Sequence, residues 1–167
     1  VPSSNILRNM LVETDILPQL AERGYNVLHI TSKLGAYVNH TKVNREKFFD
    51  TLTAWGKNPL KKFVIFHYSI LSEGINVSGL THCILLRNQS VVSMAQTVGR
   101  VIRLHPDDAT DIANGVIPRG QLQLYRKPTG YVTIPIHKNH GKRTLTRLQR
   151  VVDEIFIQGI PATAYVG

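Results

Sequence analysis

The spacing of apolar residues in the first third of the chain predicts two helices with a strand between them. Apolar residues recur at helical spacing over 6–23, with a bend expected near Pro18 because proline lacks the amide that a helix interior uses. A short β-rich run follows at 26–31. Over 43–55 the apolar residues are again three or four positions apart, which predicts the second helix.

Two near-continuous apolar runs, at 62–68 and 81–87, are typical of strands that are covered on both faces. We therefore expect them to be neighbouring interior strands of one mostly parallel sheet. Another helix is expected to begin at Ser90, since serine is a preferred N-cap residue. This order of elements predicts an α/β fold, with a mostly parallel sheet flanked by helices.

The last third of the chain has a different pattern. Residues 121–125 and 131–137 flank Lys-Pro-Thr-Gly, which predicts a hairpin, and 144–158 has helical periodicity. At 167 residues the chain has the length of one domain. We expect a core over 1–104, followed by a hairpin-plus-helix extension over 105–167.

Composition excludes several classes of protein. The hydrophobic fraction of 43% allows a packed core, so the chain is not disordered as a whole. No apolar run approaches the roughly 20 residues of a membrane-spanning helix, and no leader is recognisable, so we expect a cytoplasmic protein without a membrane partner. Cys83 is the single cysteine, which excludes an internal disulfide and a thiolate zinc site. His137 and His140 would make at most half a metal site, so no metal ligands are predicted.

The net charge of +9 is unevenly distributed. No Asp or Glu occurs between Asp111 and Asp153, whereas eight basic residues do. These are Arg119, Arg126, Lys127, Lys138, Lys142, Arg143, Arg147 and Arg150. Clustered positive charge favours a nucleic-acid partner, although a solvated basic face has the same pattern.

The first stretch with candidate chemistry is Ser-Glu-Gly-Ile-Asn at 72–76. It follows the apolar run that ends near Tyr68, at the carboxyl edge where open parallel sheets bind ligands. A glycine there lets the backbone approach a phosphate, and an amide side chain is able to bond a ribose. An ordinary β-to-α loop with a turn glycine is the alternative interpretation.

The second stretch is Gln-Thr-Val-Gly-Arg-Val-Ile-Arg at 96–103, on the helix expected after Ser90. At 3.6 residues per turn, Gln96, Arg100 and Arg103 project from one face, with Gly99 leaving room beside them. Two guanidinium groups on one face suit phosphate oxygens, because arginine stays charged and offers a planar fork. Two solvated arginines on an amphipathic helix are the alternative.

Together, Glu-Gly-Ile-Asn, the run at 81–87 and Gln-x-x-Gly-Arg-x-x-Arg resemble motifs V and VI of superfamily 2 helicases in order and spacing. Residues 1–4 are similar to the end of the motif IV strand. Residues 43–49 are similar to the helix that carries the family's nucleic-acid-contacting arginine. The resemblance covers 1–104 and is strongest to phage recombination helicases and restriction-enzyme motor subunits, which favours a bacterial or phage-infected cell.

The resemblance implies the second RecA-like domain of an ATP-dependent helicase or translocase, a DNA-binding hydrolase with a P-loop NTPase fold. This sequence has no Gly-x-x-x-x-Gly-Lys-[Ser/Thr] phosphate loop and no Asp-Glu pair for magnesium. ATP and Mg²⁺ are therefore expected to be shared with a preceding RecA-like domain, and this chain is not expected to hydrolyse ATP alone. The alternatives are a non-enzymatic nucleic-acid-binding module that uses 112–152, or a protein-interaction domain.

The resemblance also implies roles for individual residues at the nucleotide. The residues concerned are Arg100, Arg103, Gln96, Glu73, Gly74 and Asn76. Arg100 and Arg103 would reach the γ-phosphate as arginine fingers, and Gln96 would orient the attacking water. Gly74 would approach the phosphates through its backbone. Asn76 stands where many relatives have a ribose-bonding aspartate.

A second group of residues is implied for the nucleic-acid track, with DNA expected rather than RNA. The candidates are Ser32, Lys33, Arg45, Ser69, Lys142, Arg143 and Arg147. Ser69 is included because Tyr68 occupies the place where relatives often have a phosphate-binding threonine. Each of these residues has an ordinary surface role as its alternative.

Overall fold

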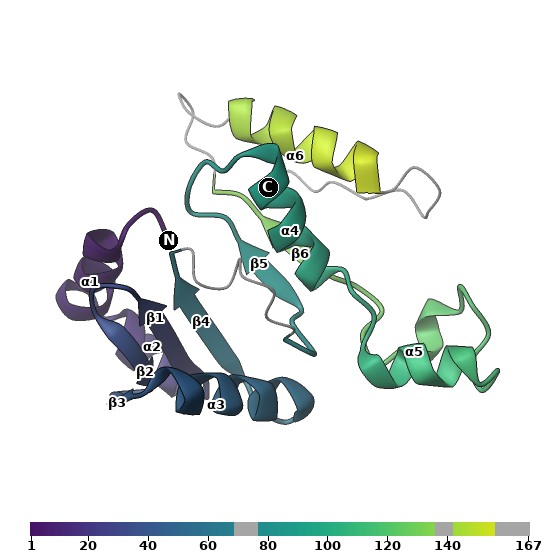
Figure 1. Ribbon diagram of the computed structural model, residues 1–167, viewed down its shortest axis with the longest axis horizontal. Coiled ribbons are helices and arrows are strands. Elements are labelled where there is room, and N and C mark those ends of the chain that lie inside the picture. The colour runs from purple at the N-terminus through teal and green to yellow at the C-terminus, as the bar shows by residue number, and fades with distance from the viewer. Residues whose placement is uncertain (69–76, 136–141, 156–167) are drawn as a thin grey trace.

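The computed structural model of the chain has an α/β fold, and it describes residues 1–68, 77–135 and 142–155 (Figure 1). Two sheets lie in it, one of four strands and one of two. Within the described ranges, no helix combines the length and apolar character that crossing a membrane requires.

The predicted first helix is divided into α1 (Ser4–Glu13) and α2 (Ile16–Glu22). Ser3 caps α1, since its hydroxyl accepts the amide hydrogen of Ile6 at 3.1 Å. The chain breaks at Thr14 and Asp15, and not near Pro18 as predicted. Pro18 lies in the first turn of α2, where its missing amide removes no helical hydrogen bond.

The four-stranded sheet has the order β3-β2-β1-β4. The strand predicted at 26–31 is confirmed as β1 (Asn26–Thr31), which pairs parallel to β4 (Phe63–His67) and antiparallel to β2 (Gly35–Val38). β3 (Thr41–Val43) pairs antiparallel to β2. The prediction of a mostly parallel sheet is therefore corrected: this sheet is mixed.

The β2–β3 hairpin was not predicted from the sequence. It depends on two left-handed residues, Gly35 with φ 83°, which begins β2, and Asn39 with φ 52°, in the turn that follows β2. The predicted second helix begins only after the hairpin, as α3 (Arg45–Lys57). Asn44 caps α3, because its side-chain oxygen accepts the amide hydrogen of Lys47 at 2.7 Å.

The predicted pairing of 62–68 with 81–87 in one sheet is wrong. β5 (His82–Ile84) lies in a second sheet, parallel to β6 (Tyr131–Thr133). Ile84 is 59% exposed, so this run is not covered on both faces as its apolar character suggested. Across this strand pair, the rings of His82 and Tyr131 stack with their centroids 4.7 Å apart.

The predicted hairpin at 121–137 is also wrong. Residues 122–124 form the short 3₁₀ helix η2 (Leu122–Leu124), and β6 takes β5 as its partner. The Tyr131 amide donates to the carbonyl oxygen of Thr81 at 2.8 Å, and the Leu85 amide donates to that of Thr133 at 2.9 Å. A distant parallel strand therefore meets the hydrogen-bonding needs that a hairpin would have met locally.

The helix expected after Ser90 is confirmed as α4 (Val91–Val101), with the Ser90 hydroxyl accepting from the Ser93 amide at 3.2 Å. α5 (Pro106–Ala113) was not predicted; proline at its first position and two aspartates in its first turn favour it. α6 (Lys142–Ile155) agrees with the periodicity of 144–158 over its described part. Figure 1 shows α6 alongside α4, and α5 set apart from both sheets.

The apolar core has separate clusters on the two sheets. One joins α3 to the four-stranded sheet around Leu28, Phe48 and Leu52. Another joins α4 and α6 to the two-stranded sheet around Met94 and Val151. α4 is thereby held on one side by apolar packing, while its last turn reaches the candidate site.

Candidate functional site

The structure brings Arg100 and Arg103 into one cleft of about 360 Å³, between the end of α4, the start of α5 and the loop at 77–79. Its lining consists of Val77, Ser78, Gly79, Arg100, Arg103, Leu104, Pro106, Ala109 and Lys127. Three of these side chains are cationic, and among the described lining residues none is Asp or Glu. Such a cleft has the chemistry of an anion-binding site.

The two arginines do not share one helix face as predicted. α4 ends at Val101, with Ile102 as its C-cap, so Arg103 lies beyond the helix. Burial lowers the pKa of Arg100, and the charge of Arg103 acts in the same direction. The guanidinium groups are therefore close enough to repel one another, although arginine remains charged at neutral pH. Gln96 is exposed on α4 and does not line the cleft.

The loop at 77–79 reaches the cleft because two glycines let backbones meet. A Cβ atom on Gly79 would lie 2.5 Å from the carbonyl oxygen of Gly56, and one on Gly56 would lie 2.6 Å from that of Ser78. Val77 is buried in the same core cluster as Phe48. The residues that follow the Glu-Gly-Ile-Asn stretch are thus fixed against α3. Glu73, Gly74 and Asn76 themselves, together with Ser69, lie outside the described residues.

Sequence reasoning missed Asp108, which is 0% exposed in the first turn of α5. Its Oδ1 accepts from the Arg126 amide at 3.1 Å and from Arg126 Nη1 at 3.0 Å; its Oδ2 accepts from the Lys127 amide at 3.2 Å. Burial alone would raise the pKa of Asp108, but these hydrogen bonds outweigh it and hold the pKa below its usual value. Asp108 therefore anchors the main chain at 126–127.

Lys127 was also missed as a site residue, because 127–130 was interpreted as a hairpin turn. It is 8% exposed, and its Nζ donates to the carbonyl oxygen of Arg103 at 2.6 Å. Burial lowers the pKa of this ammonium group. The residue in the sequence that indicates this close packing is Gly130, where a Cβ atom would lie 2.5 Å from the carbonyl oxygen of Val101. The segment after Lys127 needs this glycine because it passes directly against the end of α4.

Three of the proposed nucleic-acid residues lie at one end of the β2–β3 hairpin. Ser32 and Lys33 are exposed in the turn after β1, where Thr31 pairs with Gly35. Arg45 is exposed at the start of α3, directly after β3, and its guanidinium lies 5.3 Å from the ring centroid of Phe49. The fold thus gathers these residues on the four-stranded sheet.

The basic segment is partly used within the protein. Arg147 Nη1 donates to Asn88 Oδ1 at 2.7 Å and to the carbonyl oxygen of Gln89 at 2.9 Å, which ties α6 to the loop before α4. Arg126 bonds Asp111 Oδ2 at 2.7 Å as well as Asp108. Lys142 and Arg143 begin α6, and their side chains lie outside the description. The segment is therefore not one uniform binding face.

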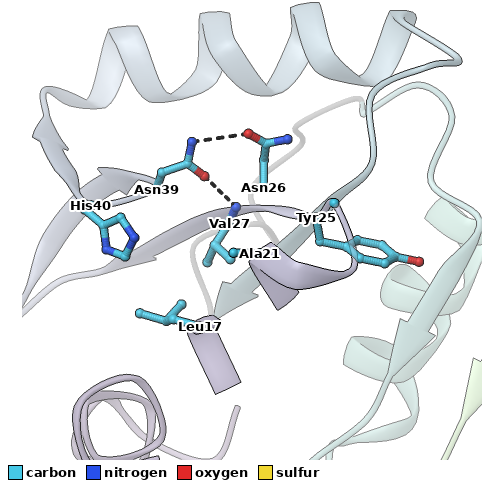
Figure 2. A pocket seen from close by; sticks show the side chains of 8 residues that line it. Leu17, Ala21, Tyr25, Asn26, Val27, Asn39 and His40 are labelled. Carbon is cyan, nitrogen blue, oxygen red and sulfur yellow. Dashed lines mark hydrogen bonds between the residues drawn. The ribbon is translucent and has the colours of Figure 1, made fainter. Parts of the chain in front are cut away.

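Another pocket, of about 370 Å³, lies at the amino end of β1 (Figure 2). Asn39 Oδ1 accepts from the Val27 amide at 2.8 Å, and Asn39 Nδ2 donates to Asn26 Oδ1 at 3.2 Å. These polar groups satisfy one another and fix the hairpin. The pocket also lies at the opposite end of β1 from the carboxyl edge, where parallel strands present ligand sites.

Metal-ligand chemistry is not apparent in the described part of the chain, where no group of three or more His, Cys, Asp or Glu residues is placed to hold an ion. Cys83 is half-buried beside the α4–α6 core cluster. Burial raises the pKa of its thiol to about 11, so it stays protonated at neutral pH and packs as a small apolar residue.

No protein-family model, no curated protein and no solved structure matches this chain.

Proposed function

We propose that this chain is the second RecA-like domain of an ATP-dependent superfamily 2 DNA helicase or translocase. The observation that carries the proposal is the cleft itself. Arg100 and Arg103 belong to the stretch that resembles motif VI, and residues 77–79 directly follow the stretch that resembles motif V. Arg100, Arg103 and residues 77–79, which β5 separates in sequence, line one cationic cleft, and this supports a shared nucleotide site.

The proposed chemistry is stabilisation of negative charge on a transferring phosphoryl group. Arg100 and Arg103 would bind the terminal phosphate of ATP as charge develops there. The described lining fits phosphate and does not fit Mg²⁺, because it is cationic and offers no carboxylate. Mg²⁺ and the phosphate loop would be supplied by a preceding RecA-like domain.

The proposed nucleic-acid track runs along the end of the hairpin that carries Ser32, Lys33 and Arg45. Two main-chain turns and the N-terminus of α3 bring these exposed groups together. Such groups suit contacts with backbone phosphates, which position a strand without reading its sequence. The alternative of a binding module that uses 112–152 is less well supported, since Arg126, Lys127 and Arg147 of that segment bond within the protein.

The experiment is a turnover measurement on the assembled ATPase, comprising this chain and the domain with the phosphate loop. Arg100→Ala and Arg103→Ala are each expected to lower ATP turnover by roughly 10³-fold or more, with a smaller effect on nucleotide binding. Arg119→Ala, an exposed arginine outside the cleft, is the matched control. Near-normal turnover in both cleft variants would refute the proposal.

A further inference from the structure

The ammonium group of Lys127 is a buried cation without a counter-charge among the described residues. Within the described ranges, its hydrogen bond goes to the main-chain carbonyl of Arg103, which uses one of the three N–H donors of the ammonium group. No ion pair joins Lys127 to an acidic residue of the described ranges. A buried charge is costly unless it is paired, so the position calls for an anion that none of the described residues supplies.

Asp108 is not that anion, although it binds the same residue. Its Oδ2 accepts from the main-chain amide of Lys127, and its charge is balanced by the Arg126 guanidinium 3.0 Å from Oδ1. The carboxylate therefore fixes the backbone of Lys127. The side chain then extends into the cleft that Arg100 and Arg103 also line.

The geometry points to Lys127 as a third phosphate-binding residue of this cleft, which also holds the main chain of Arg103 in place. The inference rests on the proposed function for the identification of the cleft as a phosphate site. The ligand group is a phosphate oxygen, which either a nucleotide or a nucleic-acid backbone supplies. Arg103 lies beyond the end of α4, and the bond from Lys127 to its carbonyl oxygen helps to fix its main chain.

The test is calorimetric titration of the 167-residue chain with sodium tripolyphosphate at neutral pH and constant ionic strength. Lys127→Met removes the charge and keeps an unbranched chain; it is expected to weaken binding by about tenfold or more, the scale of a lost charged hydrogen bond. Lys127→Arg keeps the charge and is expected to stay within about threefold of the wild type. Lys62→Met, at an exposed lysine outside the cleft, changes the net charge equally and should have almost no effect.

A measurement on the unmodified chain covers the case in which Lys127→Met does not fold. The ¹⁵Nζ and ¹³Cε signals of Lys127 are expected to shift as tripolyphosphate is added, together with the main-chain signals of Arg103. Equal tripolyphosphate affinity in wild type, Lys127→Met and Lys62→Met would overturn the inference. So would Lys127 signals that stay fixed while signals elsewhere move.

A second titration, with a twelve-residue oligothymidylate, distinguishes the two sources of phosphate. A loss of affinity in Lys127→Met for tripolyphosphate alone assigns the site to a nucleotide, and a loss for the oligonucleotide alone assigns it to the nucleic-acid backbone. Neither titration requires ATP turnover. If Lys127→Met loses affinity while Arg100→Ala and Arg103→Ala keep normal turnover in the assembled ATPase, the motor proposal fails and this inference stands. If Lys127→Met keeps its affinity while both arginine variants lose turnover, this inference fails and the motor proposal stands.

Discussion

Gly79 and Gly56 are in backbone contact: a Cβ atom on Gly79 would lie 2.5 Å from the Gly56 carbonyl oxygen. Gly79 also has a φ of 72°, in the left-handed region that favours glycine. This contact joins the last turn of α3 to the loop that lines the cleft. Space and conformation therefore both exclude a side chain at Gly79.

A comparison of Gly79→Ala with Gly24→Ala separates the cost of the backbone contact from the cost of the left-handed φ. Gly24 has a similar φ of 75°, but a Cβ atom there meets nothing within 4 Å of the described structure. We expect Gly24→Ala to lower the free energy of unfolding by about 1 kcal/mol, and Gly79→Ala to lower it by a further 1–3 kcal/mol or so. Urea unfolding measures both, and equal losses would contradict the backbone contact.

Asp108→Ala is expected to lower the free energy of unfolding by about 2–4 kcal/mol, because it leaves the amides of Arg126 and Lys127 without their acceptor. Asp107→Ala is the matched control, since Asp107 is exposed in the same turn, and its cost should be about 0.5 kcal/mol or less. Urea unfolding again supplies the measurement. A loss in Asp108→Ala no larger than in the control would show that the buried carboxylate is not an anchor.

The stability of the protein is expected to fall as the pH falls from about 6.5 towards 4. Burial lowers the pKa of His67 from 6.5 to about 4, with the charges of Arg87 and Arg100 acting in the same direction. Between these pH values the unfolded chain binds the proton and the folded chain does not, so the free energy of unfolding decreases by up to roughly 3 kcal/mol. Burial lowers the pKa of His29 as well, which adds to the slope.

Urea unfolding at several pH values between 7 and 4 measures this dependence. His67→Phe is expected to flatten the slope, because it removes the titrating group and a buried Nδ1 atom that has no hydrogen-bond partner among the described residues. The exposed His40 provides the control variant His40→Gln, which should keep the wild-type slope. A wild-type stability independent of pH over this range would contradict the burial of His67.

The isolated chain is expected to bind DNA weakly, with a Kd on the order of 10⁻⁴ to 10⁻⁶ M that weakens steeply with salt, and to show no ATP hydrolysis. The double variant Lys142→Glu, Arg143→Glu should reduce the slope of log K against log salt by about 2. Arg8→Glu, Arg23→Glu, on α1 and at the end of α2, applies the same charge change elsewhere. Equal slopes in the two double variants would assign the effect to net charge and not to the start of α6.

Arg147 is omitted from that test because its side chain forms hydrogen bonds within the protein. Its bonds to Asn88 and Gln89 hold α6 beside α4, so Arg147→Ala is expected to destabilise the protein by about 1–2 kcal/mol. Sequence reasoning grouped it with Lys142 and Arg143 because charge alone does not distinguish a cation that faces solvent from one that bonds a neighbouring loop.

Local sequence was enough to predict the elements whose signals lie within a few residues. The strand at 26–31, the cap of α4 at Ser90 and the periodicity of α6 are local signals, which act along the chain. Motif spacing likewise directed attention to Arg100 and Arg103, and the structure brings both to one cleft. Periodicity and capping need no partner from a distant part of the chain, whereas the cleft also needs residues 77–79 and Lys127.

Tertiary structure alone decided which strands pair and which charges are buried. β5 and β6 are about fifty residues apart in sequence, and no local turn in the sequence predicts their parallel pairing. The burial of Asp108 and Lys127 depends on a loop that passes the end of α4, where Gly130 allows the approach. A charged residue looks the same in a sequence whether it is solvated or buried, because the free energy of its charge depends on neighbours that only folding supplies.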